Sequence, residues 1–564
     1  MSHRHLRRSV MLAVAGALSA ASLVACGGGS SDDGAAPDGA DAEAQCQQLA
    51  DADSGEAGRD TFVFAASSDP TTLNPFHASD GETFRVSRQI FEGLVSAKPC
   101  TADPAPSLAT EWETSDDGKS TTFTLREGVE FQDGTPFNGA AVCSMFEYWN
   151  NQPAGPAQTE DVTYYWISLF KGFGDKSIYD SCATEGNTAT ITLKQPYAGF
   201  VASMSLPAFS MQSPAALEQY NQVEDGGDPT SSEYGTAHPT GTGPYSFVSW
   251  DRGQAVTLKA NPTYWGDKAK TENVRITTIA DGKARTDALR AGDIDGFDLV
   301  GPGDIKPLQD EGFDLVQRPA FNVLYLGFNQ KIPALADPKV RQAIALAIDK
   351  DAIVSQSMTP GSVPAKEFIP EVVNGYNADV KTYDQDVEQA KALLKEAGQE
   401  NLELTFNYPT DVSRPYMPSP QDTFNVIRGQ LQDVGITITP VADQWSPDYL
   451  DKIQGSEDHG IHLLGWTGDY NDTDNFLGVF FGAATNEWGF DNQALFDELS
   501  SARQLPTVDE QTPVYEKINA DVMDYLPGVP LAHGVPSLAF GEGVKGFVPS
   551  PVQDEPFSNI TVAE

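Results

Sequence analysis

The sequence predicts an α/β protein built from two or three domains. Its 564 residues are too many for a single hydrophobic core. From 320 to 530, helical and strand patterns alternate, which is typical of a layered α/β domain. From 98 to 228, short strands are separated by Gly, Pro and Asp turns, which indicates an α+β segment.

The first 25 residues have the layout of an export signal: arginines, an apolar run and small residues before a cysteine. The run VMLAVAGALSAASLV falls short of the ~20 strongly apolar residues of a membrane span. The ending LVAC resembles a lipobox, which predicts cleavage before Cys26 and lipid attachment to it. A plain secretory signal is the alternative, and the pair Arg7 and Arg8 leaves twin-arginine export open.

Residues 26–59 are predicted to be a flexible acidic tether. The stretch CGGGSSDDGAAPDGADAEA is made mostly of Gly, Ser, Ala and Asp, which cannot bury a core. Two acyl chains on one residue hold a protein stably to a bilayer. Together, the signal and the tether predict a globular protein anchored to the outer face of the cell membrane.

The chain is strongly acidic, with 80 Asp and Glu against 36 Lys and Arg and a net charge of −44. Nucleic acid is therefore excluded as a partner, because phosphate binding needs clustered Lys and Arg. A solvated surface that keeps an exported protein soluble explains the acidity. A preference for cationic ligands is the alternative explanation.

Four cysteines follow the predicted lipid site: Cys46, Cys100, Cys143 and Cys182. An even number in an exported chain indicates disulfides, and four cysteines allow three pairings. We favour Cys143 with Cys182 and Cys46 with Cys100. No CxxC element is present, so a zinc site is not predicted.

In chain order, TFVFAASSDPTTLNPF, residues 61–76, is predicted to be a short strand followed by a Pro-rich loop, and SRQIFEGL, residues 87–94, is predicted to be a helix. The α+β segment carries strands at STTFTLREGVEF, residues 120–131, and at TATITLKQPY, residues 188–197.

The segment from 320 to 530 has the clearest periodicity. DPKVRQAIALAIDKDAI carries one apolar helical stripe, with Asp337 as N-cap and Pro338 at the first helical position. The stripe consists of Val340, Ala343, Ile344, Ala347 and Ile348. A second helix, YDQDVEQAKALLKEAG, should stop at Gly398. The strand NLELTFNYP, a helix near 423–434 and the strand GITITPV follow.

Enzyme signatures are missing. No serine lies in G-x-S-x-G, and the S-x-x-K match from Ser168 to Lys171 lacks its companion motifs. GKS at 118–120 lacks the earlier glycine of a phosphate loop, and His459 and His462 are not part of H-E-x-x-H. We therefore predict no catalytic residue, no metal site and no cofactor.

The stretch GWTGDYNDTDNFL, residues 465–477, is the main candidate site. It fails as a calcium loop, because counting from Asp469 the sixth position is Asp474 and the twelfth is Phe480. Asp469 beside Trp466 and Tyr470 suits an ammonium ion, through a charge-assisted hydrogen bond and cation–π contact. An aspartate that caps the following helix or turn is one alternative, and spacing alone does not exclude a glycosidase carboxylate pair.

Several stretches, in this order and spacing, resemble the peptide/nickel-type substrate-binding proteins of ABC importers, the group that contains oligopeptide- and dipeptide-binding proteins. The resemblance covers roughly residues 60–564. It is carried by PSLATEWETSDDGKSTTFTLREGVEFQDGTPFNGAAV (106–142), GTGPYSF (241–247), NPTYWG (261–266), TDALRAGDIDG (286–296), LYLGFN (324–329), VRQAIALAIDK (340–350), AKALLKEAG (390–398) and GWTGDYNDTDNFL.

The resemblance implies a bilobal clamp of the periplasmic-binding-protein type, with two hinge crossings, that closes on a ligand between its lobes. It also implies an extra α+β domain inserted in lobe one. The expected segments are 60–95, 233–319 and 533–564 for lobe one, 96–232 for the extra domain and 320–532 for lobe two.

Site residues follow from the same resemblance. Asp469 matches the aspartate that holds a peptide's α-ammonium, and Arg414 in SRPYMP matches an arginine that meets the peptide carboxylate. A surface or lobe-stabilising salt bridge is the alternative for Arg414. Thr72, Leu73, Trp466 and Tyr470 are expected to line the pocket. Asp472 and Asp474 are expected to stabilise the loop, in which Thr473 departs from the DPDNF common in relatives.

The sequence thus predicts a monomeric lipoprotein that captures short peptides and passes them to an ABC permease without covalent chemistry. One alternative keeps the scaffold and changes the ligand to an oligosaccharide or a metal–chelator complex. A peptide-sensing receptor without import and a cell-surface hydrolase are further alternatives.

Overall fold

The structure, a computed structural model, describes residues 39–224 and 226–564. The predicted signal, residues 1–25, and the predicted lipid site Cys26 lie outside the described residues. Within the described ranges, no helix combines the length and the apolarity that crossing a membrane requires.

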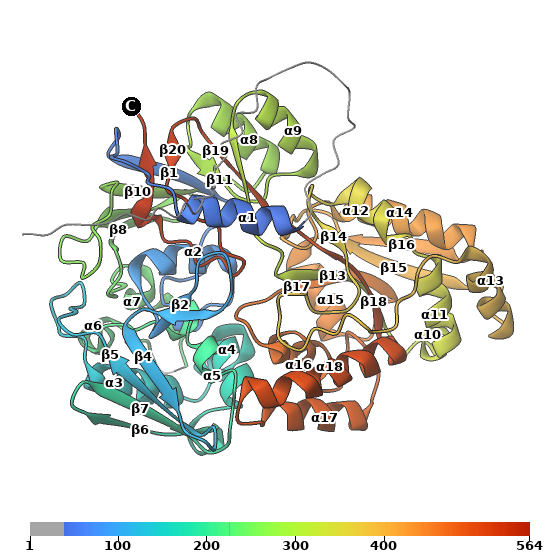
Figure 1. The fold of residues 1–564 in the computed structure, drawn as a ribbon, viewed down its shortest axis with the longest axis horizontal. Coiled ribbons are helices and arrows are strands. Elements are labelled where there is room, and N and C mark those ends of the chain that lie inside the picture. Colours follow the sequence, from blue (N-terminus) through green and yellow to red (C-terminus); the bar gives the residue numbers. More distant parts are fainter. Residues whose placement is uncertain (1–38, 225) are drawn as a thin grey trace, which may run out of the picture. The chain divides into compact units, whose positions relative to one another are not determined.

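A seven-stranded sheet joins strands from distant parts of the chain, in the order β12-β19-β11-β1-β10-β9-β8 (Figure 1). Its central strand β1 (Thr61–Ala66) is parallel to both β10 (Asn273–Thr278) and β11 (Gly296–Phe297). One face is covered by α8 (Gly282–Ala291) and α9 (Pro302–Asp310), whose Leu289 and Leu308 pack with Ala65. The remaining strands are β8 (Tyr245–Asp251), β9 (Ala255–Ala260), β12 (Asp314–Gln317) and β19 (Ser537–Phe540).

A six-stranded sheet has the order β14-β18-β13-β17-β15-β16. All seven residues of β13 (Asn322–Phe328) are buried, because it lies between β17 (Ile461–Thr467) and β18 (Gly528–His533) and is antiparallel to both. The remaining strands are β14 (Val363–Pro364), β15 (Glu403–Pro409) and β16 (Thr437–Asp443). Since β15 is parallel to β16 and to β17, the sheet is mixed.

The helices of this region confirm the sequence periodicity. In α11 (Pro338–Ala347) the Asp337 carboxylate accepts from the backbone N–H of Lys339, and the predicted stripe is at most 1% exposed. After α13 (Val387–Glu396), Gly398 adopts a φ of +69°, which suits glycine. The other helices are α10 (Pro333–Ala336), α12 (Lys350–Ser357), α14 (Pro420–Asp433), α15 (Leu450–Gly455), α16 (Leu477–Phe481), α17 (Gln493–Arg503) and α18 (Val508–Tyr525).

Between β1 and β8 lies the α+β segment. Its four-stranded antiparallel sheet has the order β4-β5-β7-β6, and its buried apolar side chains join those of β1 in one cluster. The segment thus shares a core with the seven-stranded sheet, while its predicted boundaries at 96 and 232 stay a prediction. Its main elements are β4 (Ala109–Thr114), β5 (Ser120–Leu125), β6 (Tyr179–Glu185), β7 (Thr188–Leu193), α3 (Gly139–Asn150), α4 (Glu160–Phe170), α5 (Phe200–Ser203), α6 (Pro214–Tyr220) and α7 (Glu233–Thr236).

The predicted helix at 87–94 is shifted. In the structure, α2 (Gly81–Ile90) begins earlier, because the Asp80 carboxylate accepts from the backbone N–H of Thr83. After α2, the chain forms a small hairpin of β2 (Val95–Ala97) and β3 (Pro104–Pro106).

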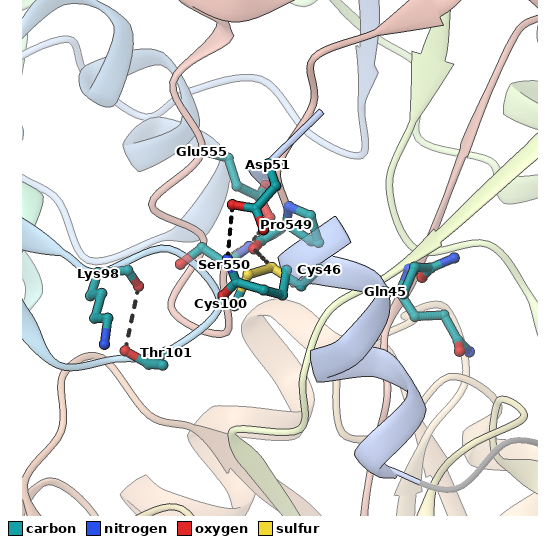
Figure 2. Close-up of a disulfide and its surroundings, with 11 residues drawn as sticks. Gln45, Cys46, Asp51, Lys98, Cys100, Thr101, Pro549, Ser550 and Glu555 are labelled. Atoms are coloured by element: carbon teal, nitrogen blue, oxygen red, sulfur yellow. Dashed lines mark hydrogen bonds between the residues drawn. A yellow bond between two sulfur atoms is a disulfide. The ribbon is translucent and has the colours of Figure 1, made fainter. Parts of the chain in front are cut away.

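The tether prediction is wrong for its second half. Residues 39–50 form the helix α1 (Gly39–Ala50), in which Ala42 and Cys46 are buried one turn apart. A disulfide joins Cys46 to Cys100 beside Pro549 and Ser550 (Figure 2). The composition is poor in large apolar residues, yet this covalent bond holds the helix to the fold. A second disulfide joins Cys143 to Cys182, so both favoured pairs are present.

The chain passes between the two large sheets twice within the described residues, as the resemblance predicted. One crossing connects β12 to β13, and the other, from Gly534 to Pro536, connects β18 to β19. The Arg318 backbone N–H donates to Pro536 O at 2.9 Å. The Asn322 side chain donates to Gly534 O and accepts from the Gly534 N–H, both at 2.8 Å. The two crossings therefore lie side by side.

A buried ion cluster lies at the first crossing. Arg318, 1% exposed, binds both oxygens of Glu555 at 2.6 and 2.8 Å and Asp298 at 2.8 Å. Arg85 of α2 binds the other oxygen of Asp298 at 2.6 Å and Glu82 at 2.8 Å. Burial alone would raise the pKa of the Asp298 carboxyl, but Arg318 and Arg85 hold this pKa well below its usual range.

We predict that Arg318→Met lowers the free energy of unfolding by about 3–5 kcal/mol, because among the described residues Arg85 is the one cation that stays within ion-pair distance of Asp298 and Glu555. Urea unfolding followed by tryptophan fluorescence measures this. The matched control is Arg290→Met, which breaks a partly exposed pair with Glu311 and should cost less than about 1 kcal/mol. Equal losses in the two variants would contradict a structural role for the buried cluster.

Candidate ligand-binding site

A cavity of about 660 Å³ lies between segments that belong to the two sheets. Its size fits the usual range for small-molecule sites, roughly 300–1,000 Å³. Residues of α2 and α4 line it on one side, and residues of β13 and of the C-terminal half of β17 line it on the other. Its charged, polar and aromatic lining includes Arg88, Tyr164, Tyr165, Tyr325, Arg414, Trp445, Gln454, Trp466, Asp469, Phe480, Glu487 and Trp488.

Asp469 lies two residues after β17, at the cavity wall. The Tyr165 hydroxyl donates to Oδ1 at 2.8 Å and the Asn475 amide donates to Oδ2 at 3.1 Å, while the Asp469 N–H donates to Asn475 Oδ1 at 2.7 Å. Each carboxylate oxygen keeps a free lone pair. Arg88, the cation whose charge reaches Asp469, is itself bound to Asp554 at 2.9 Å.

Burial raises the pKa of the Asp469 carboxyl to about 6, against the opposing effects of Asn475, Tyr165 and Arg88. A partly desolvated carboxylate of this kind is stabilised by a cation that enters the cavity. The loop is therefore prepared for a positively charged group.

Arg414 lines the same cavity from a tight turn in which it exchanges two backbone hydrogen bonds with Met417, at 3.0 and 2.9 Å. Its guanidinium lies over the Trp445 ring, 4.3 Å from the centroid. Its Nε is buried without a hydrogen-bond partner, and no carboxylate among the described residues lies within ion-pair distance. The salt-bridge alternative is thus not what the structure contains.

Trp466 lines the cavity as predicted, but Tyr470 does not. Tyr470 is 1% exposed, and its hydroxyl is 3.0 Å from that of Tyr197 in the α+β segment. Because the chain bends after β17, the neighbouring side chains of Asp469 and Tyr470 point to different sides. Tyr470 fastens the loop instead of lining the cavity.

Thr72 and Leu73 also lie outside the cavity lining, which corrects a second expectation. The Thr72 hydroxyl is 3.3 Å from Gly235 O and 3.2 Å from Thr230 O, and the Leu73 N–H donates to Gly235 O at 2.7 Å. Both side chains are at most 1% exposed. This part of the loop is bonded to the protein interior. The loop reaches the cavity wall only at Ser79 and Asp80, directly before α2.

The remaining aspartates of the loop stabilise it. The Asp472 side chain accepts from the Asp474 N–H and caps the turn Thr473–Asn475. Asp474 forms a buried ion pair with Arg503 of α17. The capping role considered for Asp469 therefore belongs to Asp472, and Asp469 is left to face the cavity.

Three residues of the cavity wall were not predicted from the sequence: Tyr165, Arg88 and Glu487. A signal for the first was present: YYW at 164–166 places three aromatic residues in succession on α4, more than one helical face can bury. Trp166 takes the core position, and Tyr165 reaches the cavity. No sequence pattern around Arg88 or Glu487 indicates a cavity residue, because the segments that surround each of them in space are distant in the sequence.

Two lobes joined by paired crossings, with a cavity between them, define a hinge-closing binding protein. The model of the bacterial extracellular solute-binding proteins, family 5 middle, matches residues 103–488. The chain therefore belongs to this family of bacterial extracellular solute-binding proteins.

Individual relatives match over nearly their whole length. The dipeptide-binding protein of Escherichia coli K12 is 30% identical over 516 residues, which cover 89% of this chain and 94% of that protein. Heme-binding protein A of Haemophilus influenzae is also 30% identical, covering 89% and 92%. The periplasmic binding protein DppA of Helicobacter pylori, solved with the peptide STSA, has a TM-score of 0.74 and 25% identity, covering 90% and 99%.

We predict that affinity for a ligand with an ammonium group falls about tenfold per pH unit below pH 6, because protonation removes the charge of Asp469. Calorimetric titration of trialanine from pH 4.5 to 8 measures this. Above pH 6 the carboxylate becomes mostly ionised, so the affinity should approach its maximum near pH 7 and fall again near pH 8, where the peptide's α-ammonium (pKa about 7.7–8.0) loses its proton. In Asp469→Asn the affinity should be low at every pH, so an unchanged slope in this variant would contradict the assignment.

Proposed function

We propose that this protein captures short peptides as zwitterions in the cavity between its lobes and delivers them to an ABC permease. The observation that carries the proposal is the presence of two opposite charges, Asp469 and Arg414, on the wall of one cavity. Neither has an ion-pair partner of opposite charge among the described residues. A peptide supplies both missing partners, an α-ammonium and an α-carboxylate.

In this proposal Asp469 accepts the ammonium hydrogens, and Tyr165 and Asn475 hold its carboxylate in position. Arg414 takes the carboxylate with its planar guanidinium, which can donate two parallel hydrogen bonds. Trp445 behind the guanidinium keeps it oriented. The names of the Escherichia coli and Helicobacter pylori relatives, a dipeptide-binding protein and a protein solved with a bound peptide, support the ligand class.

Closure makes this charge recognition effective. The cavity wall contains residues of both lobes, so bringing the lobes together around the ligand removes water from both charge pairs. The paired crossings provide the hinge for this movement. A monomer anchored by Cys26 to the outer face of the cell membrane would then present the closed form to the permease.

We predict that Asp469→Asn weakens trialanine binding by about 2 kcal/mol or more, because a partly buried charged partner is lost. N-acetylation of the peptide removes the ammonium and should cost a similar amount in the wild type. In Asp469→Asn, acetylation should cost little more. Calorimetric titration of both peptides against both proteins measures how the substitution and the acetylation act together on the binding free energy. If the two losses of binding free energy simply add, Asp469 does not contact the ammonium directly.

The corresponding cycle for the other end combines Arg414→Met with C-terminally amidated trialanine. Amidation should weaken binding to the wild type and have little effect in the variant. Mass spectrometry of the ligand that co-purifies with the protein checks the ligand class independently. Recovery of an oligosaccharide or a metal chelate, with no peptide, would contradict the proposal.

A further inference from the structure

A second carboxylate, Glu487, lies in the wall of the cavity and is only 7% exposed. The Tyr325 hydroxyl donates to its Oε1 at 2.7 Å, and the Gln454 amide is 3.4 Å from its Oε2. Among the described residues, the one basic side chain in contact with its carboxylate is His462, whose Nε2 is 3.3 Å from Oε1, while His459 Nε2 is 3.1 Å from the Glu487 backbone oxygen. An imidazole N–H that donates to Oε1 leaves the carboxylate its negative charge. No Lys or Arg among the described residues neutralises Glu487.

The surroundings of Glu487 are aromatic. Tyr325 lies 5.1 Å from Trp488 and 5.4 Å from Phe480, between ring centroids, and Trp466 lies 6.4 Å from Phe480. All four of these aromatic residues line the cavity. The faces of such rings carry negative potential and attract a cation, and a desolvated site strengthens this attraction.

The combination of a buried carboxylate and a cluster of aromatic rings on the cavity wall suits one ligand group in particular. A lysine or arginine side chain has an apolar stem that packs against rings and a cationic head that pairs with a carboxylate. Apolar side chains fit the rings but leave the Glu487 charge desolvated and without a cation, which is costly. Acidic side chains are repelled.

We infer that Glu487 is the specificity-determining residue that accepts the basic side chain of a bound peptide, so that the protein prefers short cationic peptides. The inference rests on the proposed function, since it concerns a second contact within the same cavity. Asp469 and Glu487 then have separate tasks: one binds the α-ammonium common to all peptides, and the other selects among side chains.

The test uses tripeptides in which one alanine at a time is replaced by lysine or by norleucine, which has a similar stem without the charge. Calorimetric titration against the wild type should show one position at which lysine binds at least tenfold more tightly than norleucine. In Glu487→Gln this ratio should fall to about one, with norleucine affinity unchanged or improved. The retained norleucine affinity also shows that the variant is folded and its cavity intact.

A matched control is Asp491→Asn. Asp491 is four residues after Glu487, is exposed and lies outside the cavity lining, so the substitution removes a negative charge without changing the cavity wall. It should keep the lysine preference of the wild type. If Glu487→Gln loses binding of every peptide, Glu487→Asp, which keeps the charge, should restore the lysine preference. Failure of that rescue would overturn the inference.

The two proposals fail in different ways. If the wild type binds the tripeptides but no position prefers lysine, or if Glu487→Gln keeps the preference, the role of Glu487 is overturned while peptide capture stands. If the wild type binds none of the tripeptides, peptide capture fails and the specificity inference fails with it.

Discussion

The hydrogen-bonded pairing of the two chain crossings is the constraint on which the rest of the structure depends. Arg318 and Asn322 on one crossing are bonded to Pro536 and Gly534 on the other, so the two chain connections between the lobes lie along one narrow line. The buried contacts of Arg318 with Asp298 and Glu555 fix that line in lobe one. Rotation about it opens or closes the cavity without breaking either sheet, which is what a capture-and-release protein requires.

The loop after β17 lines the cavity and is also bonded to other parts of the protein. Asp469 faces the cavity, while its neighbours bind other parts of the protein: Tyr470 contacts Tyr197, and Asp474 pairs with Arg503, which also donates to Leu169 O at 2.9 Å. A ligand-binding carboxylate needs such support, because a mobile one would lose entropy on binding. Asp472 and Asp474 therefore stabilise the loop, and Asp469 is the acid that the proposed function assigns to the ligand.

Much of the fold could be predicted from local patterns, because those patterns reflect burial. Residues close together in the sequence determine the apolar stripe of α11 and its N-cap at Asp337. They also determine the end of α13 at Gly398. The docking of α1 could not be predicted, because its composition is that of a linker and its attachment depends on Cys100, far along the chain. Tyr470 and Thr72 were misplaced for the same reason, since their partners are distant in sequence.

The proposed function requires one cavity to recognise both ends of a peptide, through Asp469 and Arg414. A crystal structure of the protein with bound Ala-Lys-Ala tests this requirement. We expect the α-ammonium within hydrogen-bond distance of the Asp469 carboxylate and the α-carboxylate on the Arg414 guanidinium, with the lobes closed around the peptide. A peptide bound in the reverse direction, or bound without contact to either residue, would contradict it.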